Sequence, residues 1–156
     1  MIYDEEDLLK SLQSYVKANL NTRIAAINTE KGDFTTETIT ADDDHYVFAG
    51  ELYEIPNHTF VNFAIDGEIE VKSNYDDKIS LPVFRVEVAF DNPKNENTYF
   101  KALRYMRALY ETVLKFESSI SEIDDLMVTK AIPMVVTTAT GRKLIVSGVS
   151  LSVSLG

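Results

Sequence analysis

The sequence predicts an α+β fold in which a mainly antiparallel sheet packs against two helices. Two stretches repeat apolar residues at helical spacing, and several others alternate apolar with polar residues. The clearest alternation places serines between Val149, Leu151 and Val153, which is typical of a strand with one buried face. We expect a single domain over residues 1–156, with the element order α-β-β-(β)-β-α-β-β.

Composition limits the kinds of chemistry that this chain can support. A chain of 156 residues with 45% hydrophobic content, 8 Phe and 8 Tyr can bury a substantial core. The absence of cysteine excludes disulfides, thiolate metal sites and cysteine nucleophiles. No apolar run approaches the length of a membrane span, and the N-terminus does not resemble a signal peptide. We therefore expect a soluble, intracellular protein.

The first helix is predicted over residues 5–27. Asp4 and the carboxylates after it suit a helix start, because negative charge is favourable at the positive end of the helix dipole. An apolar stripe at three- and four-residue spacing follows it: Leu8, Leu12, Val16, Leu20, Ile24 and Ile27. Residues 28–44 are polar and predict a loop or arm, which could be either flexible or a short irregular strand.

Strands are predicted over residues 45–56, 59–65 and 84–90. Between the last two, Asp66 and Gly67 form a dipeptide typical of hairpin turns, followed by a short alternating stretch at residues 68–72. The segment 84–90 alternates large apolar residues with polar ones, including Phe84 and Phe90. These large apolar side chains must be buried by neighbouring elements, and we therefore expect this strand to lie in the centre of the sheet.

The second helix is predicted over residues 97–117, with a stripe formed by Tyr99, Leu103, Met106, Tyr110 and Val113. Its polar side carries Lys101, Arg104 and Arg107. Arg107 can pair with Glu111 four residues on, whereas Lys101 and Arg104 have no evident local partner. Two long strands follow, at residues 127–138 and 143–155, and residues 140–142 join them as a hairpin.

The residues that could carry chemistry are few. His45 follows Asp42, Asp43 and Asp44, but consecutive carboxylates point in different directions and lack the spacing of a calcium loop, so we expect no metal site there. The same argument applies to Tyr75, Asp76 and Asp77. No phosphate-binding loop and no serine nucleophile motif occurs. We therefore expect no cofactor, no metal and no catalysis.

Charge is distributed unevenly along the chain. Its net value is −10, but residues 1–98 carry 8 Lys/Arg against 20 Asp/Glu, and residues 99–156 carry 7 against 5. An acidic surface disfavours sequence-independent nucleic-acid binding. The asymmetry could reflect solvated loops, or it could drive head-to-tail association. In the second case we expect an interface that uses Lys101, Arg104 and Arg107, together with Val149, Leu151 and Val153 of the last strand.

The order of elements resembles the neck and tail-completion proteins of tailed bacteriophages and prophages, particularly the tail-terminator group. The similar segments are DLLKSLQSYVKANL, TFVNFAIDGEIE, VFRVEVAF and YFKALRYMRALYETV, followed by the terminal hairpin. The resemblance implies a virion protein, assembled in the bacterial cytoplasm, that forms a ring, commonly a hexamer. Such a ring caps the tail tube, joins it to the head-tail connector and lets DNA pass through its lumen without specific binding.

Two other classes remain open from the residues alone. One is a small-molecule-binding or enzymatic α+β domain, with a pocket lined by Tyr46, Tyr53, Tyr99 and Tyr110. The other is an adaptor that dimerises through an edge strand such as residues 149–155.

Overall fold

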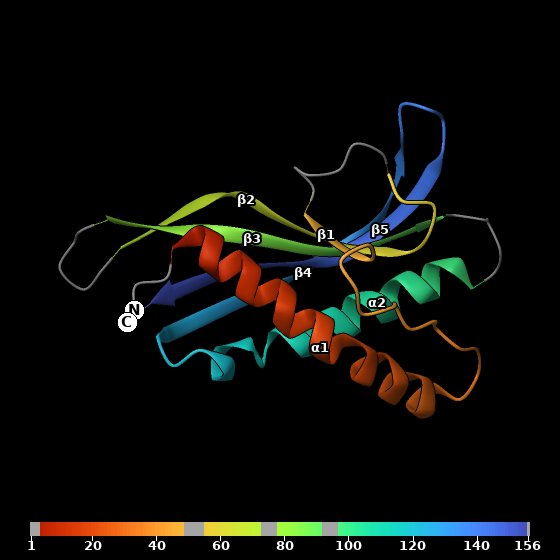
Figure 1. Cartoon of the computed structure of the whole chain (residues 1–156), viewed down its shortest axis with the longest axis horizontal. Helices are drawn as coiled ribbons and strands as arrows, with labels where there is room; N and C mark the ends of the chain where they lie inside the picture. Colours follow the sequence, from red (N-terminus) through yellow and green to blue (C-terminus); the bar gives the residue numbers. More distant parts are fainter. Residues whose placement is uncertain (1–3, 49–54, 73–77, 92–96, 156) are drawn as a thin grey trace.

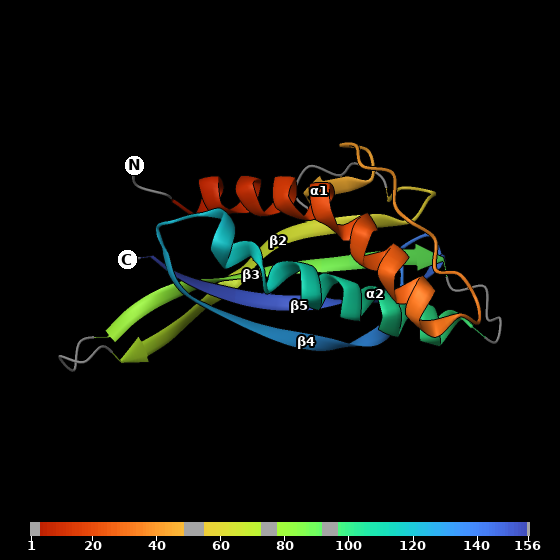
Figure 2. The same cartoon turned by 90° about the horizontal axis from the view of Figure 1, so that it is seen from below.

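The computed structural model describes residues 4–48, 55–72, 78–91 and 97–155, and it describes the backbone alone at residues 68–72 and 78–80. A five-stranded sheet in the order β1-β2-β3-β5-β4 forms one layer, and helices α1 (Glu5–Lys31) and α2 (Thr98–Val113) form the other. Both helices cover the same face of the sheet (Figures 1 and 2). The predicted α+β class and its order of helices and strands are confirmed.

Helix α1 begins and ends at local signals in the sequence. Asp4 caps its first turn by accepting a hydrogen bond from the Asp7 amide at 2.9 Å. The whole predicted stripe is buried, from Leu8 to Ile27. The predicted end at residue 27 is wrong, because the helix continues to Lys31 and stops at Gly32, which adopts φ +67° and so favours glycine.

Strand β2 (Phe60–Lys72) runs through the position where a hairpin was predicted. The Asp66–Gly67 dipeptide is a bulge rather than a turn, because the register of β2 against β3 (Lys78–Asp91) shifts by one residue between Ile65 and Glu68. Gly67 adopts φ +104° there. Strand β3 is the middle strand of five, which confirms its predicted central place.

Strand β1 begins one residue after its predicted start at residue 45. Within the described residues it covers Tyr46–Phe48 and pairs in parallel with residues 61–63 of β2. Residues 49–54 of the predicted strand, including Tyr53, lie outside the described residues, as do Tyr75, Asp76 and Asp77.

Helix α2 ends at Val113 rather than at the predicted residue 117, and it buries a face that is rotated from the predicted stripe but shares Val113 with it. Its buried residues are Thr98, Ala102, Tyr105, Ala108, Leu109, Thr112 and Val113. Tyr99 is 50% exposed, although the stripe placed it in the core. Alanines 102 and 108 allow close packing, and Tyr105 donates its hydroxyl to the Glu37 carbonyl at 2.7 Å, which fixes this face inward. A short helix, η2 (Phe116–Ser119), follows.

The chain closes with the predicted hairpin of β4 (Ile123–Thr137) and β5 (Lys143–Leu155). Strand β5 is not an edge, because it pairs with β3 on one side and β4 on the other. Val149, Leu151 and Val153 are buried in the core beneath the helices. An edge-strand dimer through residues 149–155 is therefore excluded in this fold, and these side chains are core residues rather than exposed interface residues.

Candidate functional site

Strand β4 forms one edge of the sheet, and its burial pattern is unusual. Only Ile123 of its fifteen residues is buried. No strand of the described chain pairs with its outer side. A long edge with free backbone N–H and C=O groups is a template for pairing with another chain. This edge is therefore the first candidate for an interaction surface.

The second half of this edge is apolar and exposed. Residues 131–136 read AIPMVV, and each is exposed except Pro133, which is half-buried. Ile132 is 81% exposed and Met134 is 61% exposed. Soluble domains seldom display such a run without a use for it, since it costs solubility and promotes aggregation. Figure 1 shows that this end of the β4–β5 hairpin projects away from the helices.

Local sequence explains why the run is displayed. The register of β4 against β5 shifts between Ala131 and Met134, so residues 132 and 133 form a bulge opposite a single residue of β5. Pro133 suits a bulge because it has no N–H to donate to the ladder. Just before it, Lys130 lies over the Tyr110 ring at 4.6 Å, which joins β4 to α2.

The basic row of α2, which was predicted to face a second copy, is paired within the chain. Lys101 binds Glu37 at 2.9 Å, and Arg104 binds Asp33 at 2.9 Å. Neither cation has a partner within helical spacing, as expected, but both are paired with carboxylates from a distant part of the chain and so are not free to contact a second copy. Their partners lie about seventy residues earlier in the sequence, beyond the reach of helical spacing rules.

The third cation of the row belongs to a small network. Arg107 pairs with Glu30 and, at 3.0 Å, with Glu111, as the four-residue spacing predicted. Glu111 also pairs with Arg23 of α1, so the network joins the two helices. Burial raises the pKa of the Glu111 carboxyl, but the hydrogen bonds from Arg23 and Arg107 outweigh it and hold this pKa below its usual value.

The polar segment at residues 33–45 is held against α2 and α1 along its length. Arg104 donates to the Phe34 carbonyl at 3.1 Å and lies over the Phe34 ring at 3.8 Å. Its hydrogen bond lowers the pKa of Asp33 to about 2. Asn28 and Asn21 of α1 each form two hydrogen bonds with the backbone of this segment. The segment is thus neither a free arm nor a strand.

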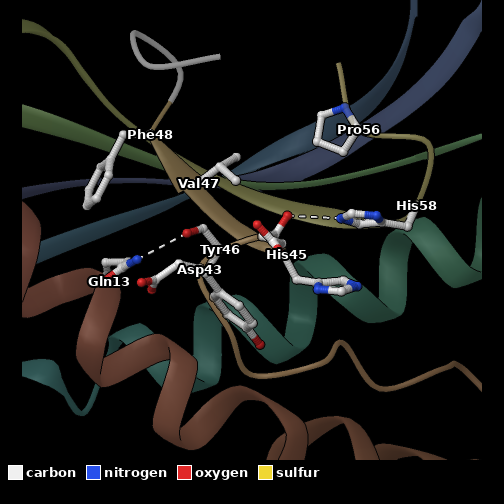
Figure 3. A pocket seen from close by; sticks show the side chains of 9 residues that line it. Gln13, Asp43, His45, Tyr46, Val47, Phe48, Pro56 and His58 are labelled. Carbon is white, nitrogen blue, oxygen red and sulfur yellow. Dashed lines mark hydrogen bonds between the residues drawn. The ribbon is translucent and has the colours of Figure 1, made fainter. Parts of the chain in front are cut away.

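A cavity of about 750 Å³ opens beside β1 (Figure 3). Gln13 reaches from α1 to donate to the Tyr46 carbonyl at 3.0 Å. The rings of His45 and His58 lie with their centroids 3.9 Å apart. Of the tyrosines proposed for a pocket, Tyr46 lines this one, whereas Tyr99 and Tyr110 do not, and Tyr53 lies outside the described residues. Burial, more than the nearby Asp42, raises the pKa of the Tyr46 hydroxyl.

The two histidines do not converge on a common point. His45 uses Nδ1 to contact Asp42 at 2.6 Å, which lowers the pKa of that carboxyl. His58 uses Nε2 to contact the Asp44 carbonyl at 2.9 Å. In the part of the chain that the structure describes, no three His, Asp or Glu side chains gather as metal ligands.

The predicted interface residues therefore lie in two separate places. Lys101, Arg104 and Arg107 bind the segment at residues 30–37, whereas Val149, Leu151 and Val153 lie in the core. The surface that sequence reasoning missed is residues 131–136. The sequence does carry a signal for this surface. Its six consecutive apolar residues do not alternate with polar ones, as the residues of a strand with one buried face should.

The chain matches no protein-family model, and no curated protein is significantly similar to it. The helices of the described chain include none that is long and apolar enough to cross a lipid bilayer.

Proposed function

We propose that this chain is a structural assembly protein whose copies associate into a closed ring, as the resemblance to phage tail terminators implies. The exposed apolar edge of β4 carries this proposal. A monomer gains nothing from exposing Ile132 and Met134, whereas a neighbouring subunit would bury them. The two-layer α+β fold and its element order agree with what the resemblance implies, and they support the same assignment.

In this role the chain performs no reaction and needs no cofactor. The ring, commonly a hexamer in the family it resembles, would end the tail tube and present a docking surface to the head-tail connector. Its partners would be other copies of itself, the tail tube protein and the connector proteins. The net charge of −10 suits a lumen through which DNA passes without binding. Its location would be the neck of the virion, after assembly in the host cytoplasm.

Light scattering coupled to size exclusion tests the proposal directly, with electron microscopy of the same fractions. We expect a closed ring whose population rises with concentration. The variant Ile132→Asp, which places a charge in the apolar run, should shift the equilibrium toward monomer. Ser14→Asp provides the control, because residue 14 is exposed on α1, away from β4. A monomer at every concentration would overturn the proposal.

The cavity beside β1 favours a second candidate function, the binding of a small molecule. Its volume of about 750 Å³ is within the range of ligand sites, and His45 and His58 supply polar groups at its wall. A ligand that raises the melting temperature of a monomer, with the increase lost in His58→Ala, would favour this class over assembly.

A further inference from the structure

The first half of β4 is a regular strand between two bulges. It pairs with β5 without interruption from Asp125 to Ala131, and a bulge interrupts the ladder at each end of this stretch, at Asp124 and at residues 132–133. No described strand pairs with its outer side, and Figure 2 shows β4 at one margin of the sheet. A strand of this length, with N–H and C=O groups open on one side, is able to add another strand.

The side chains of this stretch alternate between the two faces of the sheet. Leu126 and Val128 pack against the core beneath the helices, and Lys130 lies over the Tyr110 ring of α2. Met127 therefore points to the opposite face, where it is 50% exposed. A strand that adds to this edge must follow the same alternation if it is to continue the sheet.

Charges of opposite sign stand at the two ends of the stretch. Asp124 and Asp125 lie at its start and Lys130 lies near its end, and all three are exposed. None of them forms an ion pair within the described part of the chain. An antiparallel copy of the same strand would bring the acidic end of each strand to the basic end of the other, whereas a parallel copy would bring like charges together. The order of charges therefore favours β4 of a second copy, in antiparallel orientation, as the occupant of this edge.

The alternation and the charges together select a register. Two identical antiparallel strands are related by a two-fold axis perpendicular to the sheet, which leaves the helices of both copies on one side. Residues that face each other must then come from the same face, so the axis passes through a residue rather than between two. An axis at Met127 places Lys130 opposite Asp124. An axis at Val128 would place Lys130 opposite Leu126 and would form no direct charge pair there.

We propose that two free copies of this chain pair through β4, as antiparallel strands about a two-fold axis at Met127, with Lys130 of each copy opposite Asp124 of the other. The pair places the two Met127 side chains against each other and joins the two five-stranded sheets into one. This inference goes beyond the proposed ring. Because the pair and the ring would use the same edge, they exclude each other, and the pair keeps the edge covered until the ring forms.

Because the chain has no cysteine, single engineered cysteines locate the axis without background. A residue at a two-fold axis faces its own counterpart, so Met127→Cys in the full chain should form a covalent dimer on mild oxidation. Thr137→Cys is the matched control, since residue 137 is exposed on the same strand but far from the axis. Asp125→Cys mixed with Thr129→Cys should also link, whereas neither should link alone.

Lys130→Glu and Asp124→Lys test the charge pairs. Each variant places like charges opposite each other at two symmetric positions, and each should weaken pairing at least about four-fold, measured by analytical ultracentrifugation. The double variant restores opposite charges at both positions and should regain the parent's pairing. Lys130→Gln, which loses the contact with the Tyr110 ring without adding repulsion, gives the baseline in melting temperature and in pairing.

Self-linking of Met127→Cys no faster than that of Thr137→Cys would overturn the proposal. A double variant that pairs as weakly as the single variants would overturn the register. Light scattering of the parent protein tests the ring separately. If the parent forms a ring but Met127→Cys does not link, only the pair fails. If Met127→Cys links but the parent forms no ring at any concentration, only the ring fails. A ring built from covalently linked pairs would show that the two contacts do not share an edge.

Discussion

Gly148 shows how one residue without a side chain controls the spacing of the sheet. It lies on β5 opposite Glu87 of β3. A Cβ placed on it would lie 2.2 Å from the Val86 carbonyl oxygen and 2.7 Å from the Glu87 Cα. Both are backbone atoms, so neither can move aside without shifting β3. The close approach of the two central strands therefore requires glycine here.

We expect Gly148→Ala to lower the free energy of unfolding by about 1–3 kcal/mol, the usual cost of overpacking a filled interior. Urea unfolding followed by circular dichroism measures the change. Ser150→Ala, two residues along the same strand, is the control and should remain close to the parent. A Gly148→Ala protein as stable as the parent would contradict the tight spacing of β3 and β5.

Arg104 is the residue that holds the polar segment most closely to α2. Its side chain is 10% exposed and joins the Asp33 carboxylate, the Phe34 carbonyl and the Phe34 ring. Loss of the cation–π contact alone removes about 0.5–1 kcal/mol. We expect Arg104→Ala to increase the fraction of chains with this segment open about two- to five-fold, measured as the rate of proteolysis at residues 33–45. Lys115→Ala, at an exposed position just after the end of α2, should leave that rate unchanged.

At the level of elements, the segment at residues 33–45 depends on ionised carboxylates. The hydrogen bond from Arg104 holds the pKa of Asp33 at about 2, and that from Lys17 lowers the pKa of Asp43. A carboxyl whose pKa is lowered on folding contributes stability above its unfolded pKa of about 4 and loses it as the pH falls toward the folded value. Acid should therefore detach this segment between about pH 4 and pH 2.

A nuclear magnetic resonance titration checks the acid transition. The Phe34 amide donates to the Asp33 carboxylate at 2.7 Å, so its chemical shift reports protonation of that group. We expect its midpoint near pH 2 in the parent and a move toward pH 4 in Arg104→Gln. Asp33→Asn, which cannot titrate, should abolish the step. A parent midpoint near pH 4 would show that Arg104 does not hold Asp33.

Sequence reasoning succeeded where the signal was local. The Asp4 cap, the α1 stripe and the β4–β5 hairpin all depend on residues a few positions apart, and all three are present. Asp66 and Gly67 misled because the same dipeptide suits a turn and a bulge, and only the pairing of β2 with β3 distinguishes them. The place of β5 inside the sheet, and the partners of Arg104, depend on contacts between distant parts of the chain.

For the whole molecule, part of the uneven charge of the sequence is paired inside one chain. The cations of α2 meet the carboxylates at residues 30–37, so the acidic and basic halves contact each other in the monomer. In the ring that we propose, contact between copies would then fall mainly to the exposed apolar residues of the β4 edge. Reversing the charge of Arg104 and Arg107 would first disturb the fold of each subunit, and for this reason it is a poor test of assembly.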